Sequence, residues 1–223
     1  MPAHCFTLLR RCFVVLIAFA GLPVAATEVA QPSQAPAQAV WKQQSVRFHF
    51  QSFTTFYSCS SLEEKMKRIL VALGANEATS VRSRGCTVRD EISRMPSLEI
   101  ELISPVEATP AALAELNKTK STRELAARVR GDSAKADKMA AQFPAQWRRV
   151  SLSRGQLRLE PGDCELIEQV KRRVLPKLAV KIVTDEVRCL SHQLSSAQPR
   201  LVVDVLVEMP TPDAATTPEA RAE

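Results

Sequence analysis

The chain has 223 residues, with 30 Lys and Arg against 24 Asp and Glu, and its formal net charge is +6. A charge this small over this length argues against a protein dedicated to nucleic acids. The single tyrosine also excludes the interleaved aromatic residues that are typical of single-strand binders.

The first 26 residues predict a secretory signal peptide. Arg10 and Arg11 precede an apolar run over residues 12–22, and small residues end the segment at Ala26. The run is about half the roughly 20 residues that a membrane-spanning helix needs, so removal is favoured over anchoring. We prefer the general secretory route to twin-arginine export, because no cofactor motif requires folding before export. Removal takes away two arginines and no acidic residue, which leaves a net charge of +4, four cysteines and no expected transmembrane segment.

The segment that follows divides into a linker and a first structural unit. Residues 27–40 are rich in Ala, Gln and Pro, and we expect them to be disordered. The unit covers residues 41–104 and opens with a strand, because Val46, Phe48 and Phe50 alternate with polar residues.

A helix and two strands complete this unit. Ser61 and Glu64 have the Ser-x-x-Glu spacing of a capping box, which would satisfy unpaired backbone amides at the helix start. Apolar residues then recur at helical spacing, and Gly74 can end the helix in the left-handed conformation. We expect a weak strand around Val81 and an alternating apolar strand after Pro96.

Residues 105–146 are predicted to form a polar helical connection. Thr109-Pro110 is typical of a helix start, and Ser121 with Glu124 gives a second capping-box pattern. We expect the last helix to end near Phe143-Pro144. Since apolar residues are few, each helix would either dock through one narrow stripe or extend as an arm.

The second unit, residues 147–209, repeats the order of the first, and residues 210–223 are expected to be disordered. We therefore predict a duplicated α+β fold. Each copy would run strand, helix, strand, strand, with the helices on one face of an antiparallel sheet. The matched features are Trp41 and Trp147, Cys59 and Cys164, Lys67-Arg68 and Arg172-Arg173, Cys86 and Cys189, and Pro96 and Pro199.

The four remaining cysteines predict two disulfides. In each unit a helix leaves from the first cysteine and a strand returns to the second. This favours Cys59 with Cys86 and Cys164 with Cys189 among the three connectivities that four cysteines allow. An even cysteine count suits an oxidising compartment. A zinc site is disfavoured because no Cys-x-x-Cys occurs, and we expect neither a metal nor a cofactor.

Catalytic motifs are missing from the sequence. It contains no nucleophile elbow, phosphate loop, dinucleotide fingerprint or metalloprotease helix. His49 and His192 are interpreted as solvated side chains. These observations favour a non-catalytic interaction or structural protein of the bacterial cell envelope or periplasm. The alternative is an envelope hydrolase at the junction of the two units, which a cleft joining His49, a serine and a carboxylate would favour.

The matched basic pairs suggest a binding site. Lys67 and Arg68 in the first unit, and Arg172 and Arg173 in the second, could form two cationic patches on helix faces. The simpler explanation is a solvated helix surface. If the patches bind, we expect an anionic envelope component, such as a lipid head group, a polysaccharide or an acidic protein.

Overall fold

The computed structural model describes residues 36–86, 92–93, 95–131, 139–153, 157, 159–190 and 199–210. These residues belong to one compact unit that covers residues 34–223. The strands are β1 (Ala37–His49), β2 (Tyr57–Ser58), β3 (Ser80–Arg84), β4 (Ile92–Ser93), β5 (Ser97–Glu107), β6 (Phe143–Leu152), β7 (Val180–Glu186) and β8 (Arg200–Glu208). The helices are α1 (Cys59–Ala72), α2 (Pro110–Lys118), α3 (Lys120–Arg130) and α5 (Cys164–Arg173), with 3-10 turns η1 (Pro161–Asp163) and η2 (Leu175–Lys177).

The predicted α+β class is confirmed. Six strands form one antiparallel sheet in the order β3-β5-β1-β6-β8-β7, and β2 pairs with β4 in a small second sheet. The first three strands come from the N-terminal half of the unit and the last three from the C-terminal half. In each half the strand that comes last in the chain lies in the middle, so the halves share one topology. The duplication itself stays a prediction.

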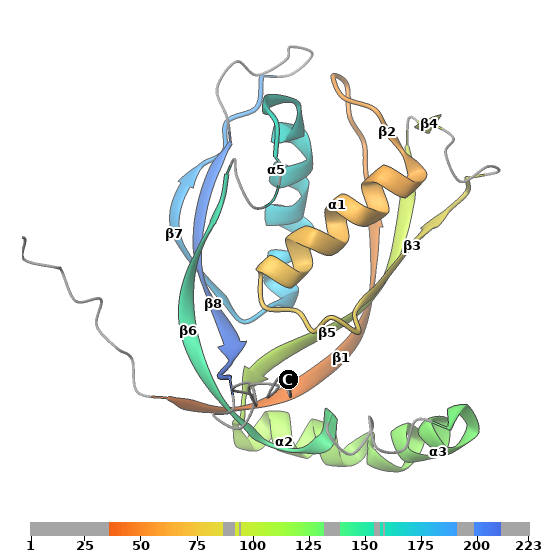
Figure 1. Ribbon diagram of the computed structural model, residues 1–223, viewed down its shortest axis with the longest axis vertical. Coiled ribbons are helices and arrows are strands. Elements are labelled where there is room, and N and C mark those ends of the chain that lie inside the picture. The colour runs from red at the N-terminus through yellow and green to blue at the C-terminus, as the bar shows by residue number, and fades with distance from the viewer. Residues whose placement is uncertain are drawn as a thin grey trace, which may run out of the picture. The chain divides into compact units, whose positions relative to one another are not determined.

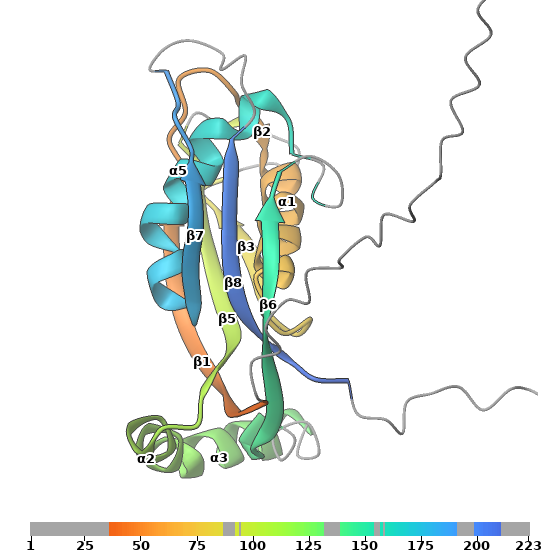
Figure 2. The same cartoon turned by 90° about the vertical axis from the view of Figure 1, so that its left-hand side faces the viewer.

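The main core lies between the sheet and helices α1 and α5. The sheet curves around α1 and α5, which belong to one buried cluster with the alternating apolar residues of the strands (Figure 1). Helices α2 and α3 lie together at one end of the sheet, away from α1 and α5 (Figures 1 and 2). None of the described helices is long and apolar enough to cross a membrane.

Two predicted capping boxes are wrong. Helix α1 begins at Cys59, and the hydroxyl of Ser58 accepts the amide of Ser61 at 3.2 Å, so the cap lies three residues earlier than expected. Helix α3 follows α2 after Thr119 alone, and Thr119 provides no side-chain cap. This short connection places Ser121 inside the helix. The predicted start at Thr109-Pro110 is confirmed, since the Thr109 hydroxyl accepts the amide of Ala112 at 3.2 Å.

Two segment boundaries are also wrong, for one shared reason. β1 begins at Ala37, inside the stretch expected to be disordered, and β6 begins at Phe143, inside the segment 105–146 that was predicted to be a helical connection. These two strand ends pair with each other over Ala37–Ala39 and Phe143–Ala145. The rings of Trp41 and Phe143 stack there with centroids 4.7 Å apart. Local composition carries no signal for a pairing between segments so far apart in the chain.

Gly74 lies where the two halves pack against each other, and its position leads to a prediction about stability. It follows α1 with φ 88°, and a Cβ there would lie 2.5 Å from the carbonyl oxygen of Leu206 in β8. We expect Gly74→Ala to lower the free energy of unfolding by roughly 2–4 kcal/mol, through left-handed strain and this clash. Gly131→Ala is the matched control, because Gly131 has φ 74° but nothing within 4 Å of its Cβ position.

Urea unfolding followed by circular dichroism measures both variants. The control should lose about 1 kcal/mol, the cost of the left-handed backbone alone. Equal losses in the two variants would contradict the predicted contact between Gly74 and β8.

Candidate anion-binding surface

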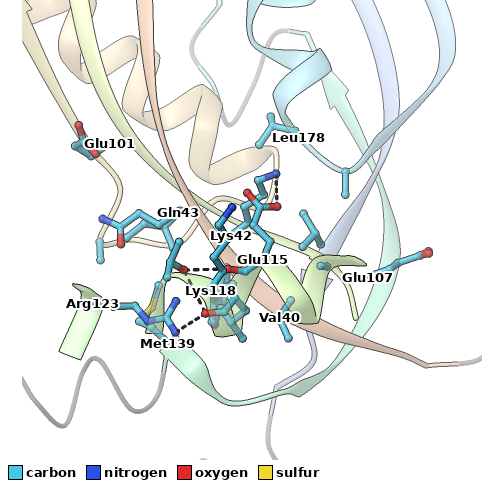
Figure 3. A pocket seen from close by; sticks show the side chains of 18 of the residues that line it. Val40, Lys42, Gln43, Glu101, Glu107, Glu115, Lys118, Arg123, Met139 and Leu178 are labelled. Carbon is cyan, nitrogen blue, oxygen red and sulfur yellow. Dashed lines mark hydrogen bonds and ion pairs between the residues drawn. The ribbon is translucent and has the colours of Figure 1, made fainter. Parts of the chain in front are cut away.

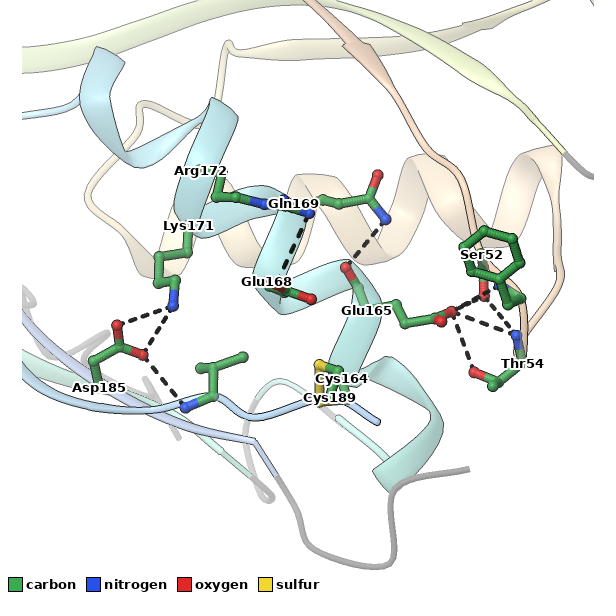
Figure 4. The surroundings of a disulfide bond; sticks show 12 residues. Ser52, Thr54, Cys164, Glu165, Glu168, Gln169, Lys171, Arg172, Asp185 and Cys189 are labelled. Atoms are coloured by element: carbon green, nitrogen blue, oxygen red, sulfur yellow. Dashed lines mark hydrogen bonds and ion pairs between the residues drawn. A yellow bond between two sulfur atoms is a disulfide. The ribbon is translucent and has the colours of Figure 1, made fainter. Parts of the chain in front are cut away.

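Two disulfides close the loops of the two halves. They join Cys59 to Cys86 and Cys164 to Cys189, the pairings that the sequence favours. Each bridge starts at the first residue of a helix and ends shortly after the strand that follows it. Beside the second bridge, Lys171 donates to Asp185 at 2.9 Å and holds the pKa of that carboxyl below its ordinary value (Figure 4).

A buried ion pair links the halves. The Lys65 ammonium in α1 lies 2.7 and 2.8 Å from the two carboxylate oxygens of Asp163 in η1, and both residues are buried. The Tyr57 hydroxyl and the Glu160 amide also donate to Asp163. Burial, reinforced by the hydrogen bond to Asp163, raises the pKa of Tyr57 above its ordinary range, so its hydroxyl stays protonated. The internal bonding of these groups points to a structural role.

A second cross-half contact holds the loop between β1 and β2. Glu165 in α5 accepts hydrogen bonds from the Ser52 hydroxyl, the Phe53 amide at 3.0 Å and the Thr54 hydroxyl at 3.2 Å (Figure 4). Gln169, one turn along, exchanges two hydrogen bonds with the backbone of Gln51, at 3.2 and 2.6 Å. The loop is therefore held against α5, and the side chains of Glu165 and Gln169 have their hydrogen-bond partners within the protein.

The predicted basic pairs are partly used in internal contacts. Lys67 donates to the carbonyl oxygens of Glu77 and Thr79, and Arg173 donates to the carbonyl oxygen of His49. The other two form weak pairs within their helices, Arg68 with Glu64 at 3.7 Å and Arg172 with Glu168 at 3.9 Å. Their side chains are 39% and 61% exposed, so Arg68 and Arg172 are the pair members that a ligand could reach.

The face of the sheet opposite α1 and α5 carries two charge ladders. In the first half, Glu99 in β5 lies opposite Arg47 in β1 and Arg82 in β3. In the second half, Asp204 in β8 lies opposite Arg149 in β6 and Lys181 in β7. We call this surface the cationic sheet face, because each central acid has a basic residue on both neighbouring strands.

The acids of the cationic sheet face are already paired. Arg84 donates to one oxygen of Glu99 at 2.8 and 2.5 Å. Arg149 donates to Asp204 at 2.9 Å, and this bond lowers the pKa of Asp204. Among the described residues Arg47 and Arg82 have no ion-pair partner, whereas Lys181 lies 4.0 Å above the Trp147 ring. In the described part of the chain, Arg47 and Arg82 are thus cations of this face without an ion pair, and Glu101, exposed on β5 two residues beyond Glu99, is an acid of the same face without one.

An open groove of about 1720 Å³ is lined by this face and by helices α2 and α3. Lys42 from β1 pairs with Glu115 of α2 at 3.3 Å, and Arg123 of α3 donates to the carbonyl oxygen of Leu116 at 3.3 Å (Figure 3). No residue of α2 is buried in the core. The charged lining residues are Lys42, Arg82, Arg84, Lys118, Arg123 and Lys181 with Glu99, Glu101, Glu107 and Glu115.

His49 meets a serine on the same face. Its Nδ1 lies 2.7 Å from the Ser97 hydroxyl, in a depression of about 230 Å³ that Glu99 also lines. Glu99 is hydrogen-bonded to Arg84, and among the described residues no carboxylate is hydrogen-bonded to the imidazole. The depression is lined by strands of the first half, and among the described residues none of the second half lines it. His192 lies outside the described residues.

The sequence pointed to only part of this surface. The alternation along β1 identifies Arg47 and His49 as outward-facing residues. It gives no information on which residues of β3 and β5 stand beside them, and Arg82, Arg84 and Glu99 were therefore missed.

Comparison with protein-family models, with curated proteins and with solved structures found no match to this chain. In the part of the chain that the structure describes, no group of three or more His, Cys, Asp or Glu could hold a metal ion. What the protein binds has to follow from the chemistry of its own surface.

Proposed function

We propose that the chain is an exported, disulfide-stabilised interaction protein of the bacterial cell envelope or periplasm that binds an anionic partner. The N-terminal segment predicts export, and the two disulfides suit an oxidising compartment. The observation that carries the binding role is the cationic sheet face, where Arg47 and Arg82 flank an acid that Arg84 already neutralises.

The cationic sheet face suits this role better than the predicted helix faces. Its arginines Arg47 and Arg82 project from strands of a continuous sheet, which fixes the spacing of their backbones, and neither has to give up an ion-pair partner in the described part of the chain to bind a ligand. Lys67 and Arg173 on the helices are instead bonded to carbonyl oxygens. The adjoining groove is larger than the roughly 300–1,000 Å³ of small-molecule pockets, so an extended acidic partner fits it better.

Two variants of equal charge distinguish the surfaces. Mature protein is immobilised and exposed to envelope extract at low and high salt. We expect Arg47→Gln with Arg82→Gln to weaken capture at least about tenfold, because two unneutralised cations are removed from the binding face. High salt should weaken capture by the unmodified protein, because exposed charges are screened.

Arg68→Gln with Arg172→Gln is the matched control on the helix faces and should bind like the unmodified protein. Loss of capture in this control alone would move the site to the helices. Partners retained at high salt by every variant would contradict an anionic partner.

A further inference from the structure

The depression at His49 is built by three neighbouring strands. His49 lies opposite Ser97 in the pairing of β1 with β5, and Arg47 lies opposite Glu99 on the same face. Arg84 of β3 lies opposite Ser97 from the other side. The depression of about 230 Å³ therefore has basic or hydroxyl-bearing side chains from each strand around it.

The charges in the depression do not cancel. Arg84 and Glu99 neutralise each other through two hydrogen bonds to one carboxylate oxygen. Arg47 lines the same depression, and it has no ion-pair partner in the described part of the chain. An unpaired guanidinium offers two parallel N–H donors to an oxyanion.

The bond between His49 and Ser97 leaves a further donor whichever way the proton lies. If the Ser97 hydroxyl donates to Nδ1, the neutral ring carries its proton on Nε2, and this N–H can donate to a ligand. If Nδ1 donates to Ser97, the hydroxyl proton is the one available. Arg47 and the His49–Ser97 pair can thus donate together to one acceptor group.

The depression continues into the large groove. Arg84 and Glu99 line both, so a ligand that lies in the groove can place one end against Arg47 and His49. The smaller volume suits a single compact group instead of a chain of sugars or residues.

We propose that Arg47, His49 and Ser97 form a subsite for one phosphate group, either the free ion or a phosphate carried by a larger envelope component. The subsite rests on the proposed function, since it names the anionic group that the cationic sheet face receives. Arg47 supplies the charge and the paired donors, and the His49–Ser97 pair supplies the third donor. The Arg84–Glu99 pair supports the depression without adding net charge.

The test uses the two histidines of the mature chain. Inorganic phosphate is titrated against chloride at constant pH and ionic strength, and the imidazole signals are followed by NMR. We expect saturable shifts of His49 with His192 unchanged, and binding at least about tenfold weaker in Arg47→Gln. Arg128→Gln removes the same charge from exposed α3 and should bind as the unmodified protein does.

The outcomes are separable. Equal shifts of both histidines would overturn the subsite. So would an Arg47→Gln variant that binds phosphate as tightly as the unmodified protein while its amide spectrum shows a native fold. Vesicles of phosphatidylcholine with and without phosphatidic acid distinguish a lipid-borne phosphate from the free ion. If phosphate fails to bind while Arg47→Gln with Arg82→Gln still loses its partner, the subsite is wrong and the proposed function stands.

Discussion

Asp163→Asn should lower the free energy of unfolding by about 3–5 kcal/mol, because Lys65 would remain as a buried charge without its counterion. Denaturant unfolding of a chain that spans residues 27–223 measures the loss. Asp204→Asn is the matched control, since Asp204 and its partner Arg149 are 21% and 52% exposed. An exposed pair contributes at most about 1 kcal/mol, so the control should remain close to the unmodified protein.

A second substitution tests whether buried charge is the cause. Lys65→Met removes the ammonium, and in combination with Asp163→Asn it leaves no buried ion at this position. The asparagine oxygen can still accept the hydrogen bond from the Glu160 amide, and its NH2 group can donate to the Tyr57 hydroxyl, which can accept. The double variant should therefore be more stable than Asp163→Asn alone. A double variant that loses the sum of the two single effects would show that charge is not responsible.

Removal of either disulfide should cost roughly 3–4 kcal/mol, because each bridge restricts the unfolded chain by closing a loop. The sequence separations are 27 for Cys59–Cys86 and 25 for Cys164–Cys189, so the two losses should be similar. Replacement of both cysteines of a bridge by alanine avoids free thiols. Denaturant midpoints with and without reductant give the measurement.

The reductant provides the control for this prediction. In each variant that lacks one disulfide, the reductant should lower the denaturant midpoint further, because it breaks the disulfide that remains. In a variant that lacks all four cysteines, the reductant should leave the midpoint unchanged. A loss under about 1 kcal/mol for either bridge would mean that the unfolded chain is not restrained as the loop-entropy estimate assumes.

Features with a local cause were predicted from the sequence. Period-two alternation identified the strand at Val46 and Phe48, and Thr109-Pro110 marked the start of α2. The cysteine pairing followed from the order of helix and strand within each unit. In each case the determining residues are close together in the chain.

Features that depend on distant segments could not be predicted. The strand pairing that starts β6 at Phe143 requires Ala39 from the other half. Lys67 belongs to a basic pair in the sequence. Its ammonium, however, donates to the carbonyl oxygens of Glu77 and Thr79, which lie 10 and 12 residues further along the chain. The charge around Glu99 depends on the register of three strands. Periodicity along one segment carries none of this information.

The contacts between the halves also bear on the export that we propose for the chain. Lys65 and Asp163 are 98 residues apart, and Ser52 and Glu165 are 113 apart. Contacts of such long range slow folding, and these cannot form until the C-terminal half has been synthesised. We expect the nascent N-terminal half to remain incompletely folded until the C-terminal half is present. If the chain is exported as we propose, a polypeptide in that condition can still be threaded through a translocation pore, and it gains its final rigidity on the far side.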